Sequence, residues 1–201
     1  ILAANRLGSA LYSELSIDPV RPANVARFVF LSPRAGGFFP DWESTANDLV
    51  PGDTNNGADI FLWERATGTT PLISRAPHGA LANGPSGIPM ISADGRLVIF
   101  ESAGSNLVEN DTNESTDLFV FDRELGTIQL VTMNLDGTAS AKSPLSTDLL
   151  GRHQAVISGD GLFAAFVSSA TNLVSTTVNK AQSHVFLRDL SAGLTRLVSD
   201  G

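Results

Sequence analysis

Residues 111–119 read DTNESTDLF, and residues 53–61 read DTNNGADIF. Both strings place Asp, Asn and Asp at their first, third and seventh positions and end on Phe. A less similar third copy ends at Phe186. Phe119 minus Phe61 is 58 and Phe186 minus Phe119 is 67, so a long unit recurs with small insertions. Self-similarity at this period is typical of repeat architectures, and we interpret the chain as a repeat protein.

The composition is that of a folded, acidic chain. The 201 residues are 42% hydrophobic, which is enough for a core, and carry a net charge of −8 with 13 Lys and Arg. This charge repels polyanions such as nucleic acid. No apolar stretch approaches the roughly 18 residues that a membrane-spanning helix needs. The chain has no Cys, so disulfides and thiolate metal sites are excluded. We expect neither nucleic-acid binding nor membrane insertion.

The middle unit is predicted to be a meander of four antiparallel strands. Asp94 and Gly95 form a turn of the kind that closes tight hairpins, between the apolar runs 88–92 and 96–101. After a polar loop, residues 117–123 and 127–132 form a second predicted hairpin. The same order recurs in the third unit.

The first unit contains an apparent insertion. Residues 19–30 align with residues 89–100 at an offset of 70, whereas later positions align at 58. The difference places a loop insertion at residues 33–44. The predicted unit boundaries are 1–74, 75–134 and 135–201.

The central strands carry apolar residues at consecutive positions, as in Leu118-Phe119-Val120-Phe121. A sheet with one face in water would alternate, so both faces of these strands are expected to be covered. Small four-stranded sheets stacked around an axis meet this demand. We therefore predict an all-β fold, a β-propeller with three four-stranded antiparallel blades in this chain; a two-sheet sandwich is the competing architecture. Three blades do not close a ring, so we expect a segment of a longer array or a ring completed by a second copy.

The middle unit resembles a known family. Ser92-Ala93-Asp94-Gly95-Arg96 before Val98-Ile99-Phe100, followed by Asp117-Leu118-Phe119-Val120 and the Gly126 turn, is similar to the WD40-like (PD40) repeat of TolB-type propellers. The likeness covers nearly the whole chain. The family turn is commonly Ser-Pro-Asp-Gly, and Ala93 and Gly159 replace its Pro here. The resemblance implies a propeller fold and a periplasmic, extracellular or cell-surface setting.

Two of the repeated loops carry oxygen side chains at the spacing that Ca²⁺ favours. Two interpretations fit them. In the first, the loops hold Ca²⁺. In the second, their Asp and Asn side chains form Asx-turns. The loops lack the acidic fifth position and the distal bidentate Glu of an EF-hand, and this favours the second interpretation. In the third unit Val178 and His184 occupy the Asp positions, so a metal site is not expected there. The candidate ligands are Asp53, Asn55 and Asp59 in one loop and Asp111, Asn113 and Asp117 in the other.

The predicted insertion also carries aromatic residues, Phe38, Phe39 and Trp42. Exposed aromatic clusters favour partner binding, whereas a loop folded over its own blade would bury them. The three His residues, His78, His153 and His184, lack metal spacing, and no nucleophile elbow, phosphate loop or His-Glu-x-x-His motif occurs.

These observations favour a non-catalytic, exported or cell-surface module for protein–protein interaction or scaffolding. Its expected partner is another protein, further blades or a second copy. Two alternatives stay open: a propeller-type hydrolase or lyase whose catalytic residues lie outside this segment, and a calcium-stabilised spacer of an adhesin-like protein.

Overall fold

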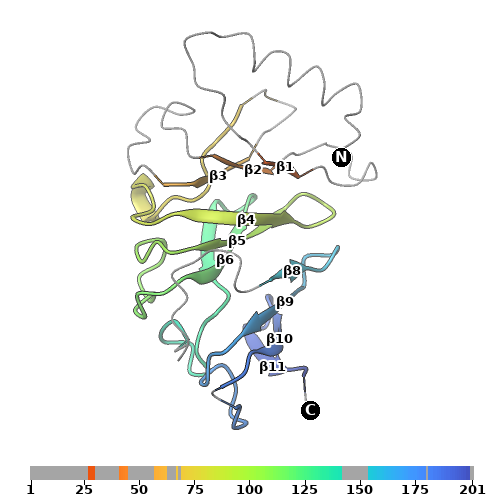
Figure 1. The fold of residues 1–201 in the computed structure, drawn as a ribbon. Coiled ribbons are helices and arrows are strands. Elements are labelled where there is room, and N and C mark those ends of the chain that lie inside the picture. Colours follow the sequence, from red (N-terminus) through yellow and green to blue (C-terminus); the bar gives the residue numbers. More distant parts are fainter. Residues whose placement is uncertain are drawn as a thin grey trace.

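The computed structural model describes residues 27–29, 41–44, 57–62, 67, 69–141, 154–179 and 181–199. These residues form three antiparallel sheets that lie one below another in Figure 1. We call them the first, central and third sheets in chain order. The all-β class is confirmed, and the helical content of the described part is one short 3-10 turn, η1 (Pro77–Gly79). No helix in this part is long and apolar enough to cross a membrane.

The central sheet is the predicted four-stranded meander, with its strands in chain order. The Asp94-Gly95 hairpin forms because Asp94 Oδ1 accepts hydrogen bonds from Ser92 Oγ at 2.5 Å and from Arg96 N at 3.0 Å, while Gly95 adopts φ 75°. This left-handed conformation favours glycine. The strands are β4 (Ser86–Ile91), β5 (Leu97–Ser102), β6 (Asp117–Asp122) and β7 (Thr127–Leu130).

The third sheet repeats this order and this turn chemistry. Asp160 Oδ1 accepts hydrogen bonds from Ser158 Oγ at 2.6 Å and from Leu162 N at 3.0 Å, and Gly161 has φ 71°. The replacement of the family's Pro by Ala93 and Gly159 therefore leaves both turns intact. The strands are β8 (Val156–Ile157), β9 (Phe163–Ser168), β10 (His184–Asp189) and β11 (Leu194–Leu197).

The first sheet corrects one prediction. It contains β1 (Arg27–Val29), β2 (Asp41–Ser44) and β3 (Asp59–Leu62), and an isolated bridge joins Phe61 to Leu72 on the outer side. Residues 41–44 are thus a strand and not part of an inserted loop. Trp42 pairs with Phe61 as Phe100 pairs with Phe119, and both pairs are related by the offset of 58. The extra residues of this unit lie between β1 and β2, at 30–40.

Apolar side chains fill the spaces between successive sheets. One cluster joins Ile60 and Leu62 of the first sheet to Val98, Phe100 and other residues of the central sheet. A second cluster joins the opposite face of the central sheet to the third sheet. Three stacked sheets rule out the two-sheet sandwich, and the described sheets form no closed ring. The members of the second cluster include Ile99, Leu118, Val120, Val131, Ala164, Phe166 and Phe186.

The apolar runs of the sequence predict six Phe residues in the core, at positions 30, 61, 100, 119, 166 and 186, and five of them are confirmed there. Each is at most 1% exposed, and two pairs stack within their own sheets at 5.9 and 5.8 Å between ring centroids. Phe30 lies outside the described residues. The confirmed residues are Phe61, Phe100, Phe119, Phe166 and Phe186, the last four forming the stacked pairs Phe100–Phe119 and Phe166–Phe186.

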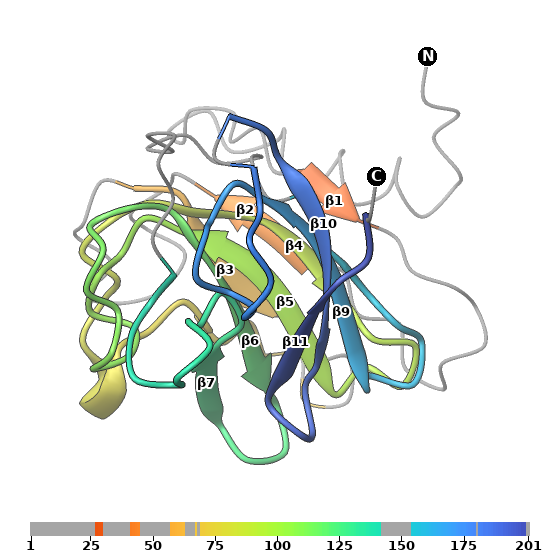
Figure 2. The same cartoon turned by 90° about the horizontal axis from the view of Figure 1, so that it is seen from below.

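The two middle strands of each sheet were predicted to be covered on both faces. This prediction is confirmed for the central sheet but not for the third sheet. β5 and β6 are buried at nearly every position. In β9 buried and half-buried positions alternate, because only the face toward the central sheet is covered by a described sheet. In Figure 2, which is seen from below, β10 and β11 lie in front of the other two sheets.

Candidate functional site

The loop between β5 and β6 carries Asp111 and Asn113 and ends at Asp117, the first residue of β6. The segment after β7 holds this loop in place. Thr112 N donates to Ser140 Oγ at 2.9 Å, and Asn113 Nδ2 donates to the Ala141 carbonyl at 2.8 Å. Because its amide nitrogen is committed to Ala141, the orientation of the Asn113 side chain is fixed. Its Oδ1 accepts the Ser115 backbone N–H at 2.9 Å.

Asp117 is tied to the neighbouring outer strand through one of its two oxygens. Thr132 Oγ1 donates to Asp117 Oδ1 at 2.5 Å and itself accepts the Leu118 N–H at 3.1 Å. The first unit repeats this arrangement, since Ser74 Oγ donates to Asp59 Oδ1 at 2.7 Å and accepts the Ile60 N–H at 3.1 Å. The carboxylate at the start of the third strand therefore has a structural role in both units, but its oxygen accepts a side-chain hydroxyl and not the backbone N–H of an Asx-turn.

Three other carboxylate oxygens in this loop are buried without a hydrogen-bond partner: Asp111 Oδ1, Asp111 Oδ2 and Asp117 Oδ2. Asp111 is 7% exposed and Asp117 is 2% exposed. The Ser140 hydroxyl and the Asn113 backbone N–H lie near enough to Asp111 to act on its carboxyl, and the Asn113 side chain lies near enough to act on Asp117. None of these groups reaches the three oxygens in hydrogen-bond geometry.

Burial perturbs the ionisation of both carboxyls, and the charge of Asp111 acts further on Asp117. Burial raises the pKa of Asp117 to about 7; the hydrogen bond from Thr132 opposes this rise, and the charge of Asp111 adds to it. Burial also raises the pKa of Asp111. Each carboxyl acts on the other, so the two groups face the same small volume.

The structure thus brings Asp111, Asn113 and Asp117 close to one another. Asp53 and Asn55 lie outside the described residues, so the first loop is known only through Asp59. Within the described ranges no group of three or more His, Cys, Asp or Glu side chains is placed to hold a metal. A cation at the second loop would depend on two carboxylates and neutral oxygens.

The sequence analysis missed the hydroxyl partners of this site. Thr132 follows Asp117 by 15 residues, as Ser74 follows Asp59 and Ser199 follows His184. Ser199 Oγ accepts the Val185 N–H at 2.9 Å, so the hydroxyl recurs in all three units. This constant spacing is the signal that would have identified it.

Most of the predicted aromatic partner site lies outside the described residues. Phe38 and Phe39 lie outside the described residues, as does the Trp42 side chain. Trp42 itself lies in β2, a strand paired on both sides. The interpretation of Trp42 as part of an exposed loop is therefore wrong.

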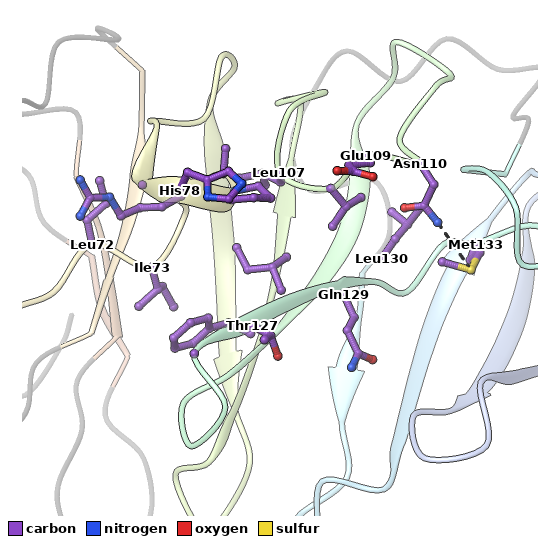
Figure 3. A pocket seen from close by; sticks show the side chains of 18 of the residues that line it. Leu72, Ile73, His78, Leu107, Glu109, Asn110, Thr127, Gln129, Leu130 and Met133 are labelled. Carbon is purple, nitrogen blue, oxygen red and sulfur yellow. Dashed lines mark hydrogen bonds between the residues drawn. The ribbon is translucent and has the colours of Figure 1, made fainter.

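A hollow of about 860 Å³ lies beside β7, between the segment 72–79 and the loop 107–110. Figure 3 shows His78, Leu107 and Glu109 along its upper side in this view, with Ile73 lower down. The described residues that line it include no Ser or Cys. An apolar hollow with a few polar groups is the usual form of a small-molecule binding site or active site.

The outer face of the third sheet exposes apolar side chains. Val185 is 38% exposed and Val198 54%, whereas their equivalents in the central sheet at an offset of 67, Leu118 and Val131, are 1% and 0% exposed. The central residues are covered by the third sheet. Further exposed apolar residues of the third sheet and its hairpins are Val156, Leu162 and Leu194.

Comparison with protein families and known proteins leaves the family open. A family model described as MmyB-like transcription regulator ligand binding domain matches residues 1–52, of which only 27–29 and 41–44 are described. This family differs from the WD40-like repeats that the sequence resembles. Comparison with curated proteins finds no match.

Two solved structures are similar to this chain. One is the tricorn protease, at 12% identity and a TM-score of 0.43, covering 79% of this chain and 12% of that one. The other is TolB from Acinetobacter baumannii, at 14% identity and a TM-score of 0.29, covering 95% of this chain and 56% of that one. The chain therefore spans less than two thirds of the length of either protein.

Proposed function

We propose that this chain is part of a β-propeller and acts as a non-catalytic module that binds another protein. The resemblance to WD40-like repeats supports the propeller, and the same resemblance is the ground for proposing a periplasmic or cell-surface setting. The exposed outer face of the third sheet carries the proposal of a protein partner. In the central sheet the equivalent face is covered by a neighbouring sheet.

The chemistry of this face fits a protein surface. Val185 and Val198 lie on adjacent strands, joined by a hydrogen bond from Val198 N to the Val185 carbonyl at 2.9 Å. Contiguous apolar patches on a soluble protein mark interaction sites. In the central sheet, Leu118 and Val131 are buried in one cluster with Phe166 and Phe186 of the third sheet. We therefore propose a partner that presents another antiparallel sheet, supplied by further blades or by a second copy.

Light scattering of the purified chain at increasing concentration tests this proposal. The wild type is expected to associate, because the apolar face leaves water when it pairs. The double variant Val185→Glu/Val198→Glu places charge on the face and is expected to shift the mass toward the 21.1 kDa of one chain.

Leu125→Glu is the matched control, because Leu125 is 64% exposed in the turn after β6 and lies off this face. It is expected to associate like the wild type. A wild-type chain that stays monomeric at every concentration, with a cooperative melt, would refute a docking role for this face.

A further inference from the structure

Buried carboxylate oxygens without donors are the most anomalous feature of the described structure. Nearly all buried polar atoms in folded proteins have a hydrogen-bond partner, and an uncompensated buried charge is strongly unfavourable. Asp111 leaves both oxygens unpartnered, and Asp117 leaves one. The ion pairs among the described residues join Arg96 to Asp122 and Glu124, and none reaches this loop. A positive charge that the chain itself does not provide would satisfy these three oxygens.

The fold itself does not require carboxylates at these positions. In the third unit Val178 takes the place of Asp111, since 178 minus 111 is 67, and it is buried in the apolar cluster between the central and third sheets. His184 takes the place of Asp117, and its Nε2 lies 3.3 Å from the Asn179 carbonyl. Lys180 replaces Asn113 in the sequence. The third unit thus loses all three oxygen side chains together and still forms the same sheet.

We propose that the loop from Asp111 to Asp117 binds one Ca²⁺ ion through the carboxylates of Asp111 and Asp117 and the side-chain oxygen of Asn113. Ca²⁺ takes six to eight oxygen ligands in flexible geometry. Asp111 has two free oxygens, and Asp117 keeps Oδ2 free while Thr132 holds Oδ1. The hydrogen bond from Asn113 Nδ2 to Ala141 fixes the amide so that Oδ1 remains on the loop side.

The affinity is expected to be low. Two carboxylates provide few charges compared with an EF-hand, and the remaining positions fall to water or backbone carbonyls. The expected Kd is about 10⁻⁴ to 10⁻³ M, the range of extracellular calcium modules. Mg²⁺ is expected to bind more weakly, because it requires near-octahedral geometry at shorter distances and loses its water reluctantly. The proposal is independent of the protein-binding role, since the loop lies on the central sheet and not on the outer face of the third.

Calorimetric titration of the chelator-treated, 201-residue chain with CaCl₂ tests the site directly. Saturable heat in the stated range is expected for the wild type. Asp111→Asn removes one charge without changing the shape of the side chain and is expected to weaken binding at this loop about tenfold or more. Asp136→Asn is the matched control, because Asp136 is exposed on another turn of the same sheet, and its titration is expected to match the wild type.

The first loop contains the same residue pattern, so the titration is repeated in an Asp59→Asn background to isolate the second loop. In that background Asp111→Asn should weaken the remaining binding by the same factor, about tenfold or more. Thermal melting with and without CaCl₂ provides a second readout in the wild type, which needs no variant to fold, and a rise in Tm is expected. Absence of both heat and Tm shift up to about 10 mM CaCl₂, above the weakest affinities of such modules, overturns the proposal and leaves a proton shared between Asp111 and Asp117. Equal heats for Asp111→Asn and the wild type in the Asp59→Asn background would also overturn it.

Discussion

At the scale of single residues, the Phe pairs determine how tightly the sheets pack. Phe119 is fully buried, stacks on Phe100 within the central sheet and contacts the cluster shared with the first sheet. Such a residue contributes through apolar transfer and through the contacts that close packing provides. Its position at the centre of the stack makes it a sensitive probe of the whole core.

Phe119→Ala is expected to lower the free energy of unfolding by about 3 to 5 kcal/mol, because it removes a buried ring and leaves a cavity. Urea denaturation measures the change. Leu125→Ala, at an exposed turn, is the comparison and is expected to stay within about 0.5 kcal/mol of the wild type. An unchanged midpoint for Phe119→Ala would remove this residue from the core.

At the scale of strands and turns, Asp122 joins two hairpins. Its Oδ2 accepts from Arg96 Nη2 at 2.8 Å, which connects the end of the turn before β5 to the start of the turn after β6. Its Oδ1 accepts the backbone N–H groups of Glu124 and Leu125. These donors favour the charged form, so the hydrogen bond from Arg96 holds the pKa of Asp122 below its ordinary value of 3.8. The carboxylate therefore stabilises the fold above this value, and the contribution disappears as the pH falls through the lowered pKa.

Asp122→Asn is expected to destabilise the protein by about 1 kcal/mol at pH 7, the sum expected of a partly exposed ion pair and turn hydrogen bonds. The difference from the wild type should shrink below pH 3.8, where the unfolded carboxyl is protonated. Urea denaturation at both pH values measures this, with Asp136→Asn as the control. A difference that is equally large at low pH would show that the charge is not responsible.

The strands that follow an Asp-Gly turn were predictable, whereas the first sheet was not. Side-chain caps fix the hairpins at Asp94 and Asp160 locally, so six residues are enough to specify them. β2 was not predicted because it contains no apolar run: Trp42 lies between Asp41 and Glu43. The apolar run at 28–31 resembled a central strand instead. The register of a sheet is determined by which residues pair across its strands. In a single sequence, the constant offset of 58 between the first and middle units is the only sign of this pairing.

The residues of the candidate site could be predicted from the sequence, but the hydrogen bonding of their carboxylates could not. The spacing of Asp111, Asn113 and Asp117 indicated a shared loop. Whether the carboxylates are satisfied depends on residues far along the chain, because Thr132 donates its hydroxyl to Asp117 and Ser140 holds the loop by accepting the Thr112 N–H. Thr132 satisfies one oxygen of Asp117, and the remaining oxygens are left buried without donors.

At the scale of the whole molecule, the three sheets differ in how completely their faces are covered. The central sheet packs against a described sheet on both faces, and the third sheet on one. β5 and β6 share six paired positions, as do β9 and β10, so the backbone hydrogen bonding of the two hairpins is matched. The central and third sheets therefore differ in how many of their faces are buried, and not in their backbone hydrogen bonding.

Hydrogen exchange in the dilute chain is expected to be slower in β5 and β6 than in β9 and β10. Opening of the central strands exposes apolar surface on two faces, whereas opening of the third sheet exposes it mainly on one. Each 1.4 kcal/mol of opening free energy corresponds to a factor of about ten, so we expect protection at least tenfold higher in the central strands. Mass spectrometry of peptides from the two hairpins measures the ratio. The ratio should fall at concentrations at which the wild type associates and stay unchanged in Val185→Glu/Val198→Glu, because only association covers the outer face. Equal protection in the dilute wild-type chain would mean that the third sheet needs no further cover, and the partner proposed for its outer face would then lose its energetic basis.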